Sequence, residues 1–525
     1  MNNLTMRQRK LVYLVGIVIL LIPIIWLGRP AGGSANPGSQ DAPTSGGHLS
    51  QLRQQYDLDE STFGNVDPSS ATMNLVLLGL RGLAVNQLWM QADEQKDTKN
   101  WAELRSTVDS IIMLQPHFLK VWRFQGWNLA YNVSASWDSL EDRYYWVKEG
   151  GKFYMEGTRR NRRYTELYWE TGRILGNKIG RSDEWRYFRQ YFKSDPDKEQ
   201  FLNGQDPGFA WAEGREFDDN FLAAEHWFRL ANEAELRREQ HIMMRMLFRF
   251  YPTHAQIEYA QGMQREGEFG ERPRAAWFEA FRGLTQEFGK EEFRQLGSRV
   301  MLDATDAEVR LLATQDGVSL QQKRADIASY QAMANYRYWR ARCAFESEGK
   351  AAEAHKRLYN GRKMYREGQT NPTHVIAVGN VCDQPDEKDD KKTTPAEKAV
   401  LKLLCASKTP LERETLLQEP LVTDELLESM KETRTIRFVS PAQIELEKGM
   451  ALYAEMIQRF PELEVDDISI EEGMMAVLYW RRNYTLFGEE GDIPESYPLK
   501  ALWVKHKARI ESLEADFERE LSTGG

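Results

Sequence analysis

The sequence predicts an all-α protein in which stacked helical hairpins follow one amino-terminal transmembrane helix. Three observations predict this fold: an apolar run near the amino terminus, apolar residues three or four positions apart from residue 71 onward, and an apolar residue paired with a glycine at a recurring interval. Hydrophobic residues make up 41% of the 525 residues and charged residues 28%, which excludes a disordered chain and a multi-span membrane protein.

The charge balance excludes one class of partner. The chain has 69 basic and 79 acidic residues, a net charge of -10. Nucleic-acid-binding proteins gain much of their affinity by neutralising phosphates, so we expect no nucleic acid partner.

The amino terminus predicts a single-pass membrane anchor. Leu11–Leu27 is an apolar run that at ~1.5 Å per residue spans about 25 Å, the short end of a bilayer crossing. Residues 1–10 contain Arg7, Arg9 and Lys10, so the positive-inside bias places them in the cytoplasm and the rest of the chain outside the inner membrane. A cleaved signal peptide is the alternative, because small residues follow the run at positions 31, 33 and 35.

Residues 28–70 predict a flexible linker. Within them, Pro30–Gly47 contains five Gly, three Pro and three Ser. Such a chain has a root-mean-square span of about 23 Å, so we expect the folded part to stay close to the membrane.

Helical repeats are predicted for residues 71–370. A large apolar residue stands four positions before a glycine three times, at intervals of 44 and 46 residues. These pairs are Leu78 and Gly82, Trp122 and Gly126, and Tyr168 and Gly172. A glycine at this position allows a neighbouring helix to approach closely.

Prolines mark the predicted ends of helices within this range. Leu104, Val108 and Ile111 form an apolar stripe that Pro116 ends, because proline cannot continue a helix. Pro252 follows Met244 and Leu247 at the same offsets.

The segment from residue 338 to 365 resembles the tetratricopeptide repeat family. The family's characteristic positions are filled here by Tyr338, Ala341, Phe345, Gly349, Ala354, Leu358 and Gly361. Arg342 departs from the family, which has a small residue there. A second, weaker match has Ala260 and Met263 on a first helix, Gly267 between helices, and Ala276, Ala280 and Gly283 on a second. The resemblance implies a superhelix with a concave binding surface. The chain also resembles membrane-anchored bacterial proteins that are built on such repeats and have no assigned activity.

The carboxy-terminal part differs from the repeats. Residues 371–440 predict an irregular charged insert, in which the segments 374–382 and 434–439 are candidates for short, paired strands. Residues 441–525 predict helices that cap the repeats, including one over 468–487 and a last apolar stripe from Leu499 to Leu521 on which His506 lies as a core histidine.

The three cysteines predict no metal site, because none lies in a C-x-x-C pair and no histidine stands at zinc spacing. In an exported domain, Cys382 and Cys405 are candidates for a disulfide, and Cys343 is expected to be a buried free thiol.

The densest basic cluster is Arg159, Arg160, Arg162 and Arg163, flanked by Tyr154, Tyr164, Tyr168 and Trp169. Guanidinium groups beside aromatic rings suit an anionic group or a protein partner. The alternative is a turn between helices whose arginines bind Glu166, Glu170 or the carboxyl end of a helix.

The sequence contains no local signature of serine hydrolysis, nucleotide binding or zinc peptidase chemistry, and we expect no cofactor. We therefore expect a membrane-anchored scaffold for protein–protein interaction in an envelope complex, whose protein partner is unknown and whose lipid contact is Leu11–Leu27. The alternative is an α/α-toroid carbohydrate-active enzyme or glycan-binding protein, which needs two carboxylates across a cleft.

Overall fold

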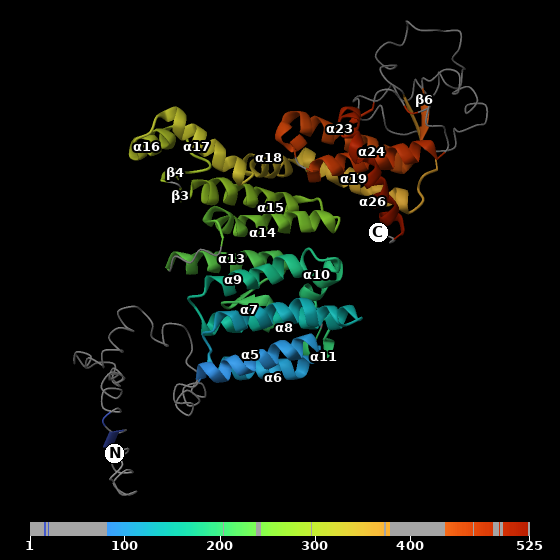
Figure 1. The fold of residues 1–525 in the computed structure, drawn as a ribbon. Coiled ribbons are helices and arrows are strands. Elements are labelled where there is room, and N and C mark those ends of the chain that lie inside the picture. The colour runs from blue at the N-terminus through green and yellow to red at the C-terminus, as the bar shows by residue number, and fades with distance from the viewer. Residues whose placement is uncertain are drawn as a thin grey trace, which may run out of the picture. The chain divides into compact units, whose positions relative to one another are not determined.

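A computed structural model describes residues 81–202, 204–237, 243–295, 297–371, 374–377, 436–465, 467–486 and 497–522, together with Val15, Gly16, Ile19 and Ile493. The described residues are mostly helical, which confirms the all-α prediction (Figure 1). The chain divides into two compact units, Met1–Ala255 and Gln256–Gly525. The division lies inside the range 71–370 that the sequence predicts as one repeat array.

The first unit consists of helices and one two-stranded ribbon. Its helices are α5 (Arg81–Asp97), α6 (Trp101–Leu114), α7 (Leu119–Trp127), α8 (Leu140–Arg160), α9 (Thr165–Arg173), α10 (Trp185–Lys193), α11 (Lys198–Phe201), α12 (Pro207–Ala210) and α13 (Asn220–Arg237). Two π-helical segments, η1 (Asn128–Val133) and η2 (Ile174–Ile179), continue α7 and α9, and strand β1 (Trp211–Ala212) pairs with β2 (Arg215–Glu216). Figure 1 shows α5 with α6, α7 with α8, and α9 with α13 as neighbouring pairs, and these pairs are in contact.

Helix α6 has the predicted apolar stripe and the predicted end. Leu104, Val108 and Ile111 are fully buried in the core of the unit. The helix ends at Leu114, two residues before Pro116. The Pro116 carbonyl then accepts hydrogen bonds from Trp122 Nε1 at 2.8 Å and from Asn161 Nδ2 at 3.1 Å.

The second predicted interval, 46 residues, is repeated in the structure. Helix α9 begins and ends 46 residues after α7, and η2 begins and ends 46 residues after η1 (165 − 119, 173 − 127, 174 − 128 and 179 − 133). The four buried residues of η1 are Asn128, Leu129, Ala130 and Val133, and those of η2 are Ile174, Leu175, Gly176 and Ile179. The two segments therefore bury the same positions as well as sharing the same bounds.

Two of the three predicted glycines lie where helices pack closely. A Cβ atom on Gly126 would stand 2.5 Å from the Tyr154 ring of α8, and one on Gly172 would stand 2.7 Å from the Phe228 ring of α13. At Gly82 the structure shows no such packing, because no atom of the described residues lies within 4 Å of the corresponding position. Gly82 is exposed near the start of α5, where no helix covers it among the described residues.

The prediction that Pro252 marks the end of a helix, as Pro116 does, is wrong. Pro252 lies inside helix α14 (Arg245–Arg265). Because α14 begins only at Arg245, Met244 and Leu247 stand at the start of this helix instead of ending an earlier one. The helix ends before Gly267, whose φ of +86° suits glycine, and this confirms the predicted turn between two helices.

The second unit is also built mainly of helices. Those before the insert are α15 (Glu271–Arg282), η3 (Gly283–Glu287), η4 (Phe288–Lys290), α16 (Asp306–Asp316), α17 (Leu320–Met333), α18 (Tyr336–Glu346) and α19 (Gly349–Arg366). Those after it are α23 (Pro441–Arg459), η5 (Pro461–Val465), α24 (Asp467–Thr485), α25 (Lys500–Lys505), η7 (Lys507–Arg509) and α26 (Ile510–Ser522). Strands β3 (Phe293–Gln295) and β4 (Ser298–Val300) form an antiparallel ribbon between η4 and α16.

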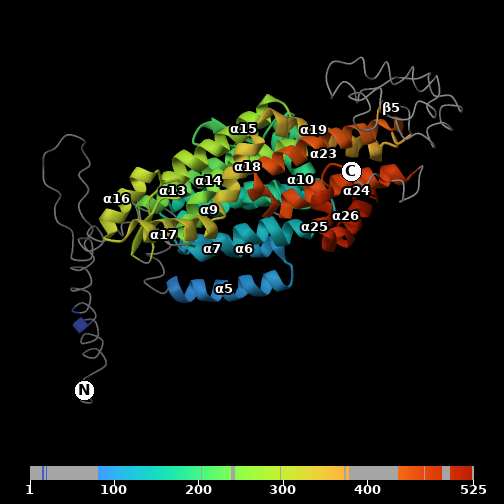
Figure 2. The ribbon, with the colours of Figure 1, turned by 90° about the horizontal axis from the view of Figure 1, so that it is seen from above.

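Helices α19 and α23 pack closely through two glycines. A Cβ atom on Gly361 would stand 2.6 Å from Leu446, and one on Gly449 would stand 2.7 Å from Leu358. Helix α24 contacts α23 as well as α25 and α26, and lies between them (Figure 2). The helices on either side of the predicted insert thus share one core.

The two ends of the predicted insert are paired strands. Strand β5 (His374–Ala377) pairs antiparallel with β6 (Ile436–Val439), with His374 opposite Val439. This confirms the strand pairing. Residues 378–435, including the charged run and both Cys382 and Cys405, lie outside the described residues.

Helices return at Pro441, as predicted, and Ser440 caps α23 by accepting a hydrogen bond from the Gln443 amide at 3.1 Å. The helix predicted over 468–487 is α24. The single last stripe is two helices instead of one, because the chain bends between α25 and α26. His506, which directly follows α25, is half-buried at this bend instead of lying fully in the core as predicted.

The predicted anchor and linker fall almost wholly outside the described residues. Of Leu11–Leu27 only Val15, Gly16 and Ile19 are described, as helix, and the linker 28–70 and Leu78 are not described. Within the part of the chain that is described, no helix has the length and apolar character needed to cross a membrane.

Candidate functional site

The four arginines predicted as an anion or partner site lie at the end of α8 and in the turn after it. Arg159 Nη1 and Arg160 Nε bind the two oxygens of Glu156 at 3.1 and 2.9 Å. The predicted partners bind elsewhere, since Glu166 and Glu170 pair with Arg123 at 3.7 and 3.6 Å. Arg159 and Arg160 thus lie at the carboxyl end of a helix, as the alternative expected, and they bind Glu156, a carboxylate that the alternative did not name.

The turn with Arg162 and Arg163 rests on the turn 46 residues earlier. His117 Nδ1 lies 3.0 Å from Asn161 Oδ1, and Tyr164 Oη donates to the His117 carbonyl at 3.2 Å. Of the flanking aromatic residues, Tyr154 is fully buried in the core and is not available to a ligand. This surface is therefore fixed in position but is less aromatic than the sequence suggested.

The residues of the tetratricopeptide-like match lie on α18 and α19. Buried among them are Tyr338, Phe345, Ala354, Leu358 and Gly361, whereas Ala341 is half-buried and Gly349 is exposed. Cys343 is a free, fully buried cysteine, as predicted, and burial raises the pKa of its thiol well above the usual range.

Next to these positions the second unit has a buried ionic cluster, formed by Arg342, Glu346, His355 and Glu472. His355 Nε2 lies 2.9 Å from Glu346 Oε1, and His355 Nδ1 lies 2.6 Å from Glu472 Oε1. Arg342 Nη2 is 2.6 Å from Glu346 Oε1 and 3.7 Å from Glu472 Oε2. The side chains come from α18, α19 and α24, so the cluster joins three helices.

Neighbouring polar groups complete this cluster. Arg342 Nη1 donates to Ser469 Oγ at 2.5 Å, and Gln264 Nε2 donates to Glu346 Oε2 at 3.0 Å. Tyr453 Oη donates to the Ser469 carbonyl at 3.0 Å. Buried charges of this kind are stable only when they are paired and hydrogen-bonded.

The pKa values of the cluster reflect the pairing. Burial alone would lower the pKa of His355, but the carboxylates of Glu346 and Glu472 outweigh it and raise the pKa to about 10. Burial would raise the pKa of Glu472, but His355 and Arg342 outweigh it and lower the pKa to about 2. At neutral pH both bases are protonated and both acids ionised, so the cluster has no net charge.

One residue in the sequence indicates this cluster. Arg342 stands where the tetratricopeptide family has a small residue, and a charged side chain on an inner helix face needs buried partners. Those partners could not be found by spacing, because Glu472 lies 117 residues beyond His355.

The first unit contains a second set of buried ion pairs. Arg189, fully buried, binds Asp219 through two hydrogen bonds of 3.2 and 2.9 Å. Lys148 Nζ lies 2.7 Å from Asp195 Oδ2 and 3.2 Å from Asp206 Oδ2. These pairs fix α8 and α10 to the segments that follow them.

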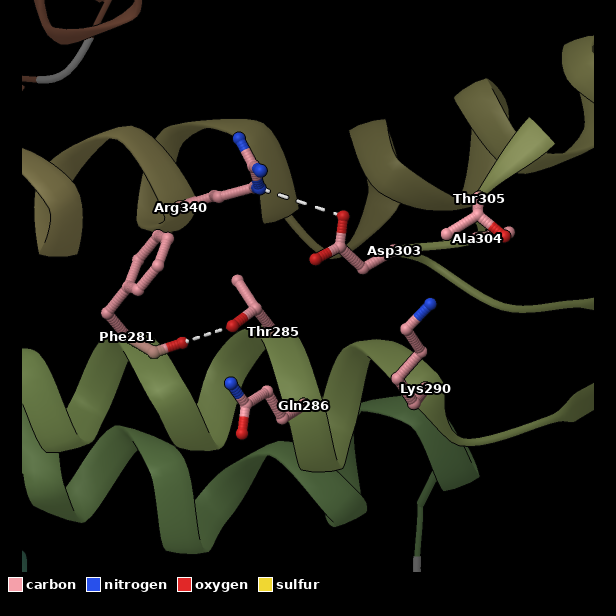
Figure 3. Close-up of a pocket in the computed structure, with 8 residues that line it drawn as sticks. All are labelled: Phe281, Thr285, Gln286, Lys290, Asp303, Ala304, Thr305 and Arg340. Atoms are coloured by element: carbon pink, nitrogen blue, oxygen red, sulfur yellow. Dashed lines mark hydrogen bonds and ion pairs between the residues drawn. The ribbon is translucent and has the colours of Figure 1, made fainter. Parts of the chain in front are cut away.

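An open, polar pocket of about 430 Å³ lies in the second unit (Figure 3). It is lined by Phe281, Thr285, Gln286, Lys290, Asp303, Ala304, Thr305 and Arg340. Arg340 Nε lies 3.7 Å from Asp303 Oδ1, and Thr285 Oγ1 donates to the Phe281 carbonyl at 2.8 Å. Outside the lining, Glu308 binds Lys290 Nζ at 2.6 Å, so each cation of the pocket has an acidic neighbour.

Among the residues that the structure describes, no group of three or more His, Cys, Asp or Glu side chains is arranged to hold a metal ion. The geometry defines a helical protein with buried ionic clusters and a repeated helix pair. No protein family model, curated protein or solved structure matches the chain.

Proposed function

We propose that this protein is a membrane-anchored scaffold of tetratricopeptide-like helical repeats, which holds a protein partner in an envelope complex. The main support is the 46-residue repetition of α7 with η1 in α9 with η2, at the same bounds and, for η1 and η2, with the same buried positions. Repeated helical elements of this kind stack by burying one another's apolar faces, and the stack presents an extended surface suited to a protein ligand.

The membrane part of the proposal is based on the sequence. Leu11–Leu27 would hold the chain in the inner membrane, with residues 1–10 in the cytoplasm and the helical part outside. Anchoring would raise the effective concentration of the scaffold for partners at the same membrane.

The toroid enzyme gains no specific support from the site. Only one of the eight residues that line the pocket, Asp303, is a carboxylate. Glu346 and Glu472 both contact His355, but each is also paired with Arg342, so neither carboxylate is free to act on a substrate. Their role is to hold helices together.

Chemical crosslinking in native membranes tests this function. The tagged full-length protein is captured after crosslinking and its partners are identified by mass spectrometry, with residues 1–47 fused to the same tag as the control. We expect a reproducible, near-stoichiometric protein that the control does not capture. Recovery of this chain without any enriched protein would contradict the scaffold.

A further inference from the structure

The start of α8 presents an unusual surface, which we call the aromatic–acidic surface: Trp137, Asp138, Glu141, Asp142 and Tyr145. Trp137 is 41% exposed and Tyr145 46% exposed, although both are large aromatic side chains. The three acids are also exposed. All five residues belong to the first unit.

The aromatic rings of this surface are held in fixed positions. Trp137 stacks on Trp146 with ring centres 6.4 Å apart, and Tyr145 meets Trp146 edge-on at 5.3 Å. Arg143 Nε donates to the Trp137 carbonyl at 2.6 Å, while its Nη1 donates to Glu184 Oε1 at 3.0 Å. Rings that are already ordered lose little conformational entropy when a ligand binds them.

The three acids differ from most carboxylates around them. Within the described part of the chain, Asp138, Glu141 and Asp142 form no ion pair or side-chain hydrogen bond, whereas further along α8 Glu149 and Glu156 each bind a basic side chain. Glu141 and Asp142 lie in the first turn of α8, where the helix dipole favours negative charge. The dipole explains acids at this position, but it does not explain why exposed aromatic rings lie beside them.

We infer that the aromatic–acidic surface binds an arginine-containing segment of the partner protein. This inference rests on the proposed scaffold function and names the chemistry of its partner. A guanidinium group stacks on the faces of Trp and Tyr and forms charge-assisted hydrogen bonds with carboxylates. This surface has two aromatic rings and three carboxylates between residues 137 and 145. Lysine satisfies the carboxylates as well, but its ammonium group stacks less well on a ring.

Fluorescence anisotropy of labelled peptides tests the inference with the full-length protein in detergent. The probes are a fluorescein-labelled decapeptide of alternating Arg and Ser and the same peptide with Lys in place of Arg. We expect the arginine peptide to bind several-fold more tightly than the lysine peptide. The two peptides have the same charge, so the general attraction of a chain of net charge -10 for cations contributes equally to both affinities.

Three variants locate the binding. Neutralising the acids (D138N/E141Q/D142N) is expected to weaken binding of both peptides about five- to tenfold, since each exposed ion pair contributes modestly. Removing the rings (W137A/Y145A) is expected to abolish the preference for arginine. The matched control E94Q/E199Q/E216Q removes three exposed charges elsewhere in the same unit and is expected to change neither affinity.

Equal affinities for the two peptides, or equal effects of the acid variant and its matched control, would overturn the inference. The proposed scaffold fails separately, through the crosslinking experiment. A partner that is still captured by D138N/E141Q/D142N at the level of the unmodified protein would leave the scaffold standing and reject this surface as its binding site.

Discussion

Gly126 of α7 lies against the ring of Tyr154 of α8, so closely that a Cβ atom at this glycine would stand 2.5 Å from the ring. The Tyr154 hydroxyl donates to the Arg123 carbonyl at 2.9 Å, which fixes the ring at this position. The same relationship recurs 46 residues later between Gly172 and Phe228. The repeated glycine is therefore a packing requirement of the repeated helix pair.

Replacing these glycines tests that requirement. Gly126→Ala is expected to lower the free energy of unfolding by about 1–2 kcal/mol, because overpacking outweighs the gain in helix propensity. Urea unfolding followed by circular dichroism measures the change. The control is Gly82→Ala, where no atom of the described residues lies within 4 Å and the same substitution is expected to be neutral or stabilising by at most about 1 kcal/mol. Destabilisation of equal size by both variants would contradict the packing role of Gly126.

The buried ionic cluster predicts a dependence of stability on pH. The pKa of His355 is raised from 6.5 to about 10, so its contribution is complete below about pH 6.5 and is lost as the pH rises through about 10. The pKa of Glu472 is lowered from 4.5 to about 2, so its contribution is complete above about pH 4.5 and is lost as the pH falls toward 2. Urea midpoints measured from pH 3 to 10 are expected to fall at both ends.

Variants test whether His355 causes the predicted loss of stability at alkaline pH. His355→Gln is expected to reduce stability at pH 6 by about 3–5 kcal/mol, because it leaves the fully buried Glu346 and the half-buried Glu472 each short of a partner. It is also expected to flatten the decline between pH 7 and 10. His117→Gln, in the first unit, is the control and is expected to retain the decline. An unchanged alkaline slope in His355→Gln would show that another group titrates there.

Cys343 is expected to resist alkylation in the folded protein. The thiol is fully buried and burial raises its pKa, so thiolate is scarce and reagents have no access. Treatment with iodoacetamide before and after denaturation, followed by mass spectrometry of the peptide that contains residue 343, measures the reaction. Rapid modification of the folded protein at this residue would contradict its burial.

The predicted topology is open to a labelling experiment. Glu94 is exposed on α5, so a cysteine introduced there (Glu94→Cys) is expected to react in intact cells with a maleimide that does not cross membranes. A cysteine introduced at residue 3 (Asn3→Cys) is expected to react only after the membrane is permeabilised. The reverse pattern would contradict an amino terminus in the cytoplasm.

Local patterns in the sequence were sufficient for much of the fold. Apolar spacing and Pro116 located the end of α6, and two β-branched segments located the pairing of β5 with β6. Pro252 is misleading because α14 continues through it, although an interior proline removes a backbone hydrogen bond and usually ends or kinks a helix. The π-helical segments were also missed, since a π turn changes hydrogen bonding without changing the apolar pattern enough to be recognised.

The site was harder to predict than the fold because its contacts are long-range. Arg342 stood out as a departure from the family pattern, but its partners Ser469 and Glu472 lie on α24, beyond the predicted insert. Likewise, Trp137 and Tyr145 are recognised as a surface only when their exposure is known. Residue spacing predicts which face of a helix is apolar, but it does not predict which distant helix will cover that face.

The most direct test of the scaffold is the native mass of the protein after gentle detergent extraction from its own membranes. The chain alone has a mass of 61.0 kDa. Mass photometry of the extracted, tagged protein is expected to show a complex heavier than the chain, and denaturing gels of the same sample are expected to show a second protein in a fixed ratio. A particle of 61.0 kDa, or of a whole multiple of it with no second protein, would contradict a scaffold that holds a partner.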